Sequence, residues 1–60
     1  MKLEELTPEA IDHIYANVDT DRLTAWQKSF IESTSDQWTR RRWLSDRQKE
    51  ILGEIWDRNP

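Results

Sequence analysis

Hydrophobic residues recur at helical spacing in three parts of the chain, and a helix-start signal precedes each part. The first stripe has the spacing i, i+3, i+4, i+7 and consists of Ile11, Ile14, Tyr15 and Val18. Thr7 stands before it as an N-cap, with Leu6 as a hydrophobic staple. Pro8 occupies the first helical position, where a missing N–H is tolerated. The pattern predicts a helix over residues 8–18.

The other two stripes begin with the same motif, because residues 23–28 and 44–49 both read L-[ST]-x-x-Q-K. This motif is a capping box, in which a hydroxyl caps the helix and a glutamine three residues later reaches back to the cap. The hydroxyls are those of Thr24 and Ser45, and the glutamines are Gln27 and Gln48. The motif predicts helices over 25–41 and 46–58. The near-repeat of about 21 residues fits a duplication or convergence on one capping solution equally well.

The two later helices differ in how strongly their patterns predict them. The helix over 25–41 has apolar positions at Trp26, Phe30, Ile31 and Trp38. Its middle, Ser33–Asp36, consists of poor helix formers, so the helix either runs unbroken or kinks near Asp36. The last helix carries Ile51, Leu52, Ile55 and Trp56 on one stripe. Gly53 lowers its stability by about 1 kcal/mol relative to alanine, and Asn59-Pro60 ends it.

Together the patterns predict an all-α fold and a single domain over residues 1–60. No segment alternates as a strand would. We expect a three-helix bundle in which the second and third helices form a hairpin. The expected core consists of Leu6, Ile11, Ile14, Tyr15, Trp26, Phe30, Ile51, Leu52 and Ile55.

A chain of 60 residues buries little surface, so its fold is marginally stable unless something reinforces it. The sequence has no cysteine and one histidine, which excludes a disulfide framework and a zinc site. We expect no metal and no cofactor. The four tryptophans can reinforce the core or contact a partner.

No apolar run reaches the roughly 18 residues that span a bilayer, and the N-terminus lacks the apolar stretch of a signal peptide. Binding to a membrane surface needs an amphipathic helix with a basic face, whereas the first and third helices have acidic or mixed faces. We therefore expect a soluble cytoplasmic protein that does not bind membranes.

Charge is unevenly distributed along the chain, whose formal net charge is −3. Residues 1–21 carry one Lys and six Asp or Glu, whereas residues 22–49 carry seven Lys or Arg and three acids. The basic segment contains the candidate partner-binding residues Arg40, Arg41, Arg42, Trp43 and Arg47. Arginines beside a tryptophan suit an acidic protein surface, or phosphates with a stacked base.

Other interpretations of the charged residues stay open. Arginines at a helix C-terminus also favour the helix dipole, and Trp43 could instead cap the core beside Leu44. The sequence pI of about 5.0 argues against nucleic acid as the main partner. The acidic residues Glu4, Glu5, Glu9 and Asp12 could face a basic partner or simply be solvated. His13 has no cysteine or second histidine to act with, so we expect no catalysis.

Two local resemblances bear on function. Residues 23–56 read L-T-x-W-x-x-x-F-I-x-S and then W-L-S-x-R-Q-x-x-x-L-x-x-I-W, which resembles small, uncharacterised helical proteins of bacteriophages and mobile elements. This resemblance implies a helical hairpin and a phage or plasmid origin. Residues 44–52 resemble the opening helix of LuxR-type and MarR-type helix-turn-helix domains. Those domains place a recognition helix later in the chain, and we expect none after Pro60.

These observations predict a small non-catalytic binding protein, an adaptor or inhibitor of phage or mobile-element origin that acts on a host protein. One alternative is a nucleic-acid-binding accessory protein that uses the patch from Arg40 to Trp43. The other is a structural module that forms a homodimer through surplus apolar surface.

Overall fold

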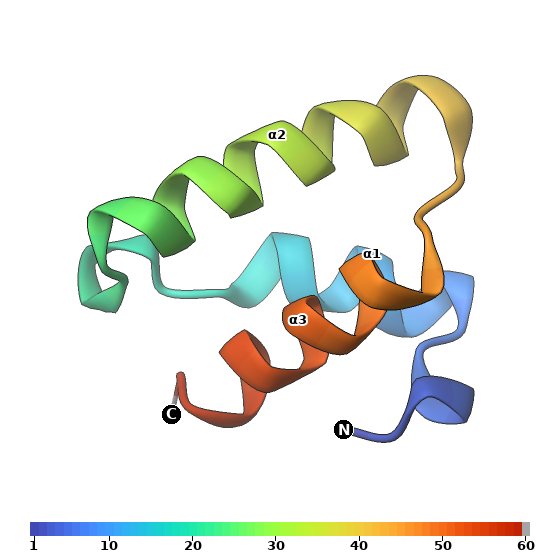
Figure 1. Cartoon of the computed structure of the whole chain (residues 1–60), viewed down its shortest axis with the longest axis horizontal. Helices are drawn as coiled ribbons and strands as arrows, with labels where there is room; N and C mark the ends of the chain where they lie inside the picture. Colours follow the sequence, from blue (N-terminus) through green and yellow to red (C-terminus); the bar gives the residue numbers. More distant parts are fainter. Residues whose placement is uncertain (60) are drawn as a thin grey trace.

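A computed structural model describes residues 1–59 and contains three α-helices and two short 3-10 helices (Figure 1). In chain order these are η1 (Leu3–Glu5), α1 (Pro8–Asn17), η2 (Thr20–Arg22), α2 (Ala25–Arg41) and α3 (Asp46–Asp57). No strand forms in this part of the chain. The prediction of an all-α, three-helix fold is confirmed, and each helix lies within one residue of its expected bounds.

The helices pack so that α1 and α3 both run in the direction opposite to α2 (Figure 1). The segment 42–45 joins α2 to α3, and the two helices form the expected hairpin. η1 lies beside α3, so the N-terminal segment also covers the bundle. Pro60, which was expected to end α3 together with Asn59, lies outside the described residues.

Each helix begins with the predicted cap. The Thr7 hydroxyl accepts from the Ala10 N–H at 3.2 Å. Both capping boxes are complete, since each glutamine side chain accepts from the N–H of its cap residue and each cap hydroxyl accepts in return. The distances are 3.0 and 3.1 Å for Thr24 with Gln27, and 2.9 and 3.1 Å for Ser45 with Gln48.

The core contains eight buried hydrophobic residues: Leu6, Ile11, Ile14, Ile31, Trp38, Leu44, Leu52 and Ile55. Five of the nine expected core residues are among them, and Tyr15, Phe30 and Ile51 are partly buried against the cluster. The prediction for Trp26 is wrong, because 61% of its surface is exposed. Trp26 follows its N-cap by two residues, at the outer start of α2, and Trp38 is the buried tryptophan of this helix.

α2 runs unbroken through its weak middle because a tertiary hydrogen bond holds it there. Thr34 is buried, and its hydroxyl donates to the Phe30 carbonyl at 2.8 Å. The same oxygen accepts from the Tyr15 hydroxyl at 2.8 Å. Burial raises the pKa of Tyr15 above its usual value of 10.0. A polar side chain thus fills a core position and ties α1 to α2.

Three contacts attach the N-terminal segment to α3 and join the segment after α3 to the segment after α1. Gly53 is buried where the N-terminal segment crosses the helix, and a Cβ at this position would lie 3.1 Å from the Met1 Cβ. The Met1 ammonium group also pairs with the Asp57 carboxylate. Asn59 is buried, donates to the Asp19 carbonyl at 3.0 Å and accepts from the Asp19 N–H at 2.8 Å.

Gln48 has a second role, because its amide forms a reciprocal pair with Gln37 of α2, with both hydrogen bonds at 3.1 Å. Gln27, which holds the matching position in the other capping box, has no such tertiary partner among the hydrogen bonds of residues 1–59. Gln48 therefore both starts α3 and attaches it to α2.

We predict that Gln48→Ala lowers the free energy of unfolding by about 2 kcal/mol, since it loses three hydrogen bonds made by the side chain. Gln27→Ala, the matched control, loses one such bond and should cost about 1 kcal/mol. Gln48→Glu keeps the hydrogen bond from the Ser45 N–H, so its loss of unfolding free energy should lie between those of Gln27→Ala and Gln48→Ala. Urea denaturation measures all three, and equal losses for Gln27→Ala and Gln48→Ala would contradict the tertiary role.

Candidate binding surface

The three consecutive arginines at the end of α2 point to different surroundings because the helix ends among them. Arg40 and Arg41 belong to the last helical turn. Arg42 is the C-cap and has left-handed backbone angles (φ 53°, ψ 35°), the one non-glycine residue with positive φ in the described chain. Its N–H still donates to the Trp38 carbonyl at 2.9 Å. The left-handed turn redirects the chain from α2 into the segment that leads to α3.

Arg42 binds to α1 rather than facing solvent freely. Its two terminal nitrogens contact the two carboxylate oxygens of Asp12 at 2.8 and 3.1 Å. The Trp38 indole N–H donates to the same carboxylate at 2.8 Å, and the guanidinium carbon lies 4.2 Å from the centre of a Trp38 ring. Bidentate pairing and stacking on an aromatic face are the two geometries in which arginine outperforms lysine.

These hydrogen bonds change the acidity of Asp12. The Arg42 guanidinium, followed by the Trp38 indole, lowers the pKa of the Asp12 carboxyl from 3.8 to about 2. Asp12 is half-exposed, so the pair is screened by solvent and acts mainly by fixing geometry. Arg42, expected as a partner-binding residue, thus contributes to the scaffold of the surface.

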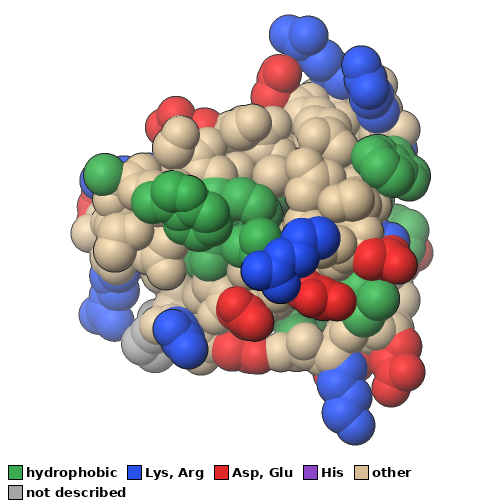
Figure 2. Space-filling model, viewed as in Figure 1, with side chains coloured by type: hydrophobic (Ala, Val, Ile, Leu, Met, Phe, Trp, Pro, Cys, Tyr) green, Lys and Arg blue, Asp and Glu red, His purple; other side chains and the backbone are tan. Residues whose placement is uncertain are grey.

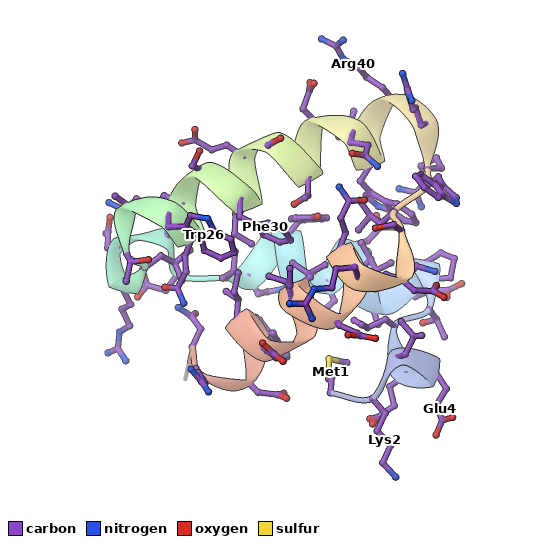
Figure 3. The ribbon with its side chains drawn as sticks, in the orientation of Figure 1. Met1, Lys2, Glu4, Trp26, Phe30 and Arg40 are labelled. Atoms are coloured by element: carbon purple, nitrogen blue, oxygen red, sulfur yellow. The ribbon has the colours of Figure 1, made fainter. Side chains whose placement is uncertain are left out.

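Arg40 and Arg41 are exposed and line a shallow polar depression of about 300 Å³ with Ser33, Asp36 and Gln37. Figure 3 shows Arg40 extending away from the end of α2. Arg40 pairs with Asp36 at 3.2 Å, an exposed contact of the kind that contributes little to stability. Arg41 forms no ion pair within residues 1–59.

Trp43 follows directly after the left-handed turn, and 58% of its surface is exposed. Leu44, the next residue, is buried in the core, so Leu44 and not Trp43 covers the core here. The Trp43 carbonyl accepts from the Gln37 amide at 3.1 Å, which attaches the segment to α2. The backbone at the exposed Trp43 is therefore fixed by the Arg42 turn before it and by the hydrogen bond from Gln37.

Arg47 lies in different surroundings from the other candidate residues. It lines a depression of about 290 Å³ between α2 and α3, together with Trp26, Gln27, Ile51, Glu54, Ile55 and Arg58. The predicted five-residue set therefore divides into three places. The sequence motif could have indicated the position of Arg47. Trp26 and Arg47 both stand two residues after the cap in the two L-[ST]-x-x-Q-K segments, and an arginine at that position is expected to face solvent.

The remaining candidates offer no further constellation. Glu4, Glu5 and Glu9 are exposed, and Asp12 is occupied by Arg42. His13 is exposed, with its ring 5.5 Å from Trp56 in an edge-to-face arrangement. Within residues 1–59, no three His, Cys, Asp or Glu side chains come together as metal ligands would. In the same part of the chain, no helix combines the length and the apolar character needed to cross a membrane.

We predict that Asp12→Asn lowers the melting temperature at pH 7 and that this difference closes on acidification. A carboxyl whose pKa falls on folding stabilises the fold above its unfolded pKa of 3.8, and the effect is lost as the pH falls through about 2. The melting-temperature difference between wild type and variant should therefore close between about pH 4 and pH 2.

The matched control is Arg42→Met, which keeps the carboxylate and removes its partner. It should lose the larger share of the pH-dependent stability, because Arg42 is the main cause of the lowered pKa of Asp12, and keep the smaller share that the Trp38 indole provides. Thermal melts at several pH values measure both shares. A difference between wild type and Asp12→Asn that stays constant from pH 7 to pH 2 would contradict the role of this pair.

The surface at the end of α2 thus combines two exposed arginines, one exposed indole and a rigid support. Comparison of the chain with protein-family models, curated proteins and solved structures finds no match.

Proposed function

We propose that this chain is a small non-catalytic binding protein, an adaptor or inhibitor, which contacts an acidic surface of a protein partner. The contacting residues are Arg40, Arg41 and Trp43, and Arg42 positions them. The observation that carries the proposal is the exposure of Trp43 two residues after Arg41, which is also exposed and has no ion-pair partner in the described chain. Tryptophan and arginine are the residue types most enriched among interface hot spots.

Preorganisation supports the same proposal. Binding costs free energy when flexible side chains and loops must become ordered. Here the left-handed turn at Arg42, its pairing with Asp12 and the bond from Gln37 to the Trp43 carbonyl fix the backbone under the indole before a partner arrives. The surface therefore needs little rearrangement to bind.

The proposal excludes catalysis for reasons of chemistry and shape. Among residues 1–59, the side-chain partners of His13 are Asn17 and Trp56, neither of which is a nucleophile. Three depressions among residues 1–59 have volumes of about 250, 290 and 300 Å³, at or below the lower end of the range for small-molecule sites. A phage or mobile-element origin, implied by the resemblance of residues 23–56, and a cytoplasmic location, which suits a cysteine-free chain, belong to the proposal.

The test compares wild type with the double variant Arg41→Ala/Trp43→Ala in capture from a nuclease-treated bacterial lysate. We expect a protein that the wild type retains and the double variant loses. Lys28→Ala, which removes a charge elsewhere on α2, is the control and should retain it. Recovery of the same proteins by all three would count against the proposed surface.

Nucleic-acid binding by the same residues is the alternative that the exposed arginines favour. A labelled single-stranded oligonucleotide tests it by fluorescence anisotropy at low and high salt. Binding through phosphates should weaken steeply with salt, with a slope of roughly 0.7 per phosphate contact in logarithmic units. Such binding, if lost in Arg40→Ala/Arg41→Ala, would favour nucleic acid over protein as the partner.

A further inference from the structure

Trp26 is the most exposed large hydrophobic residue of the described chain, and it borders a groove between α2 and α3. Its ring stacks on Phe30 with centroids 5.5 Å apart and planes 20° from parallel. Figure 3 shows both side chains on the same side of α2. Figure 2 shows hydrophobic side chains gathered over α2 and α3 on this face, with charged side chains along their border.

Trp26 stands between two depressions. One, of about 250 Å³, is lined by Trp26, Ser29, Phe30, Ser33, Thr34 and Gln48. The other is the depression of about 290 Å³ that Arg47, Ile51 and Glu54 line. Both are smaller than the sites that enclose drug-sized ligands, but each can admit a side chain. A projecting indole next to a depression of side-chain size makes this surface complementary in shape to a second copy of itself.

The charged residues on α3 also make this surface complementary to a second copy of itself. Arg47, Ile51 and Glu54 lie at i, i+4 and i+7, so they share one face of the helix, with the isoleucine between opposite charges. A two-fold axis near Ile51 would place Arg47 of each copy against the partner's Glu54. Arg47 also approaches Glu50 at 3.5 Å, but both are exposed, and such a pair holds Arg47 only weakly.

We propose that this groove binds a second copy of the chain in a two-fold symmetric dimer. The indole of Trp26 from each copy enters the partner's depression beside Ile51, and Arg47 pairs with the partner's Glu54. An isologous interface requires a patch that complements itself in shape and in charge, and both are present on this face. The groove is distinct from the surface of Arg40, Arg41 and Trp43, so the two can be occupied independently.

The expected dimer is weak, because its apolar part rests on only Trp26, Phe30 and Ile51. We expect a dissociation constant on the order of 100 µM. Sedimentation equilibrium between about 10 µM and 1 mM spans that value. The apparent mass should rise with concentration from 7.3 kDa towards twice that value. Trp26→Ala should weaken association at least about tenfold, as loss of a central tryptophan does.

Charge reversal gives the sharper test. Arg47→Glu alone places two acids against two acids in the dimer, and Glu54→Arg alone places two bases against two bases. Each variant should therefore be monomeric by itself. Mixed in equal amounts, the two variants restore both opposite-charge pairs and should associate at least as well as the wild type.

The controls are Lys28→Glu and Glu32→Arg, which reverse exposed charges on another face of α2 and should associate as the wild type does. Circular dichroism confirms that each variant is folded, and because Arg47 and Glu54 are exposed, their reversal leaves the core intact. A wild type that stays monomeric at 1 mM overturns the proposal. So does a mixture of the two charge variants that associates no better than either alone. Neither result would affect capture by Arg41 and Trp43.

Discussion

The Asp12 carboxylate, which accepts hydrogen bonds from Trp38 and from Arg42, is the contact on which the rest of the arrangement depends. It joins α1 to the end of α2, thirty residues away in the chain for Arg42. It satisfies the indole N–H of the one tryptophan that the core encloses, and it holds Arg42 in a left-handed conformation that a residue with a Cβ seldom adopts. That turn sends Trp43 outward and Leu44 into the core, and it sets the direction in which α3 begins.

Sequence predicted the helices well because their starts are encoded locally. A cap hydroxyl and a glutamine three residues later determine each capping box, so no tertiary information is needed to find Thr24 or Ser45. The core of α2 was harder to predict, because one of its inward positions is polar. Ile31, Thr34 and Trp38 face inward at i, i+3 and i+7, and the threonine interrupts the apolar stripe. Trp26 and Phe30, spaced i and i+4, resemble the apolar stripe of a buried helix face, which explains the wrong prediction that Trp26 lies in the core.

The candidate surface was predicted only in part, for a reason that lies in helix geometry. Three consecutive arginines read as one charged cluster along the chain, but successive helical residues point about 100° apart. The last of them leaves the helix altogether, and its partner on α1 cannot be found from a local pattern. The near-repeat contained usable information about Trp26, since its counterpart in the second copy is a charged residue. Alignment of the two segments predicts that Trp26 and Arg47 both face solvent.

Both exposed tryptophans stand where the backbone has little freedom. Trp26 is in the first turn of α2, which a complete capping box fixes, and Trp43 follows a turn held by Asp12 and Gln37. Both side chains are therefore exposed on an ordered backbone that directs them outward. The described residues include eight buried hydrophobic side chains, so placing two indoles outside gives up core that the fold could use. A rigid, outward-facing indole has little conformational entropy left to lose on binding, so these two positions combine a cost to folding with an advantage for association.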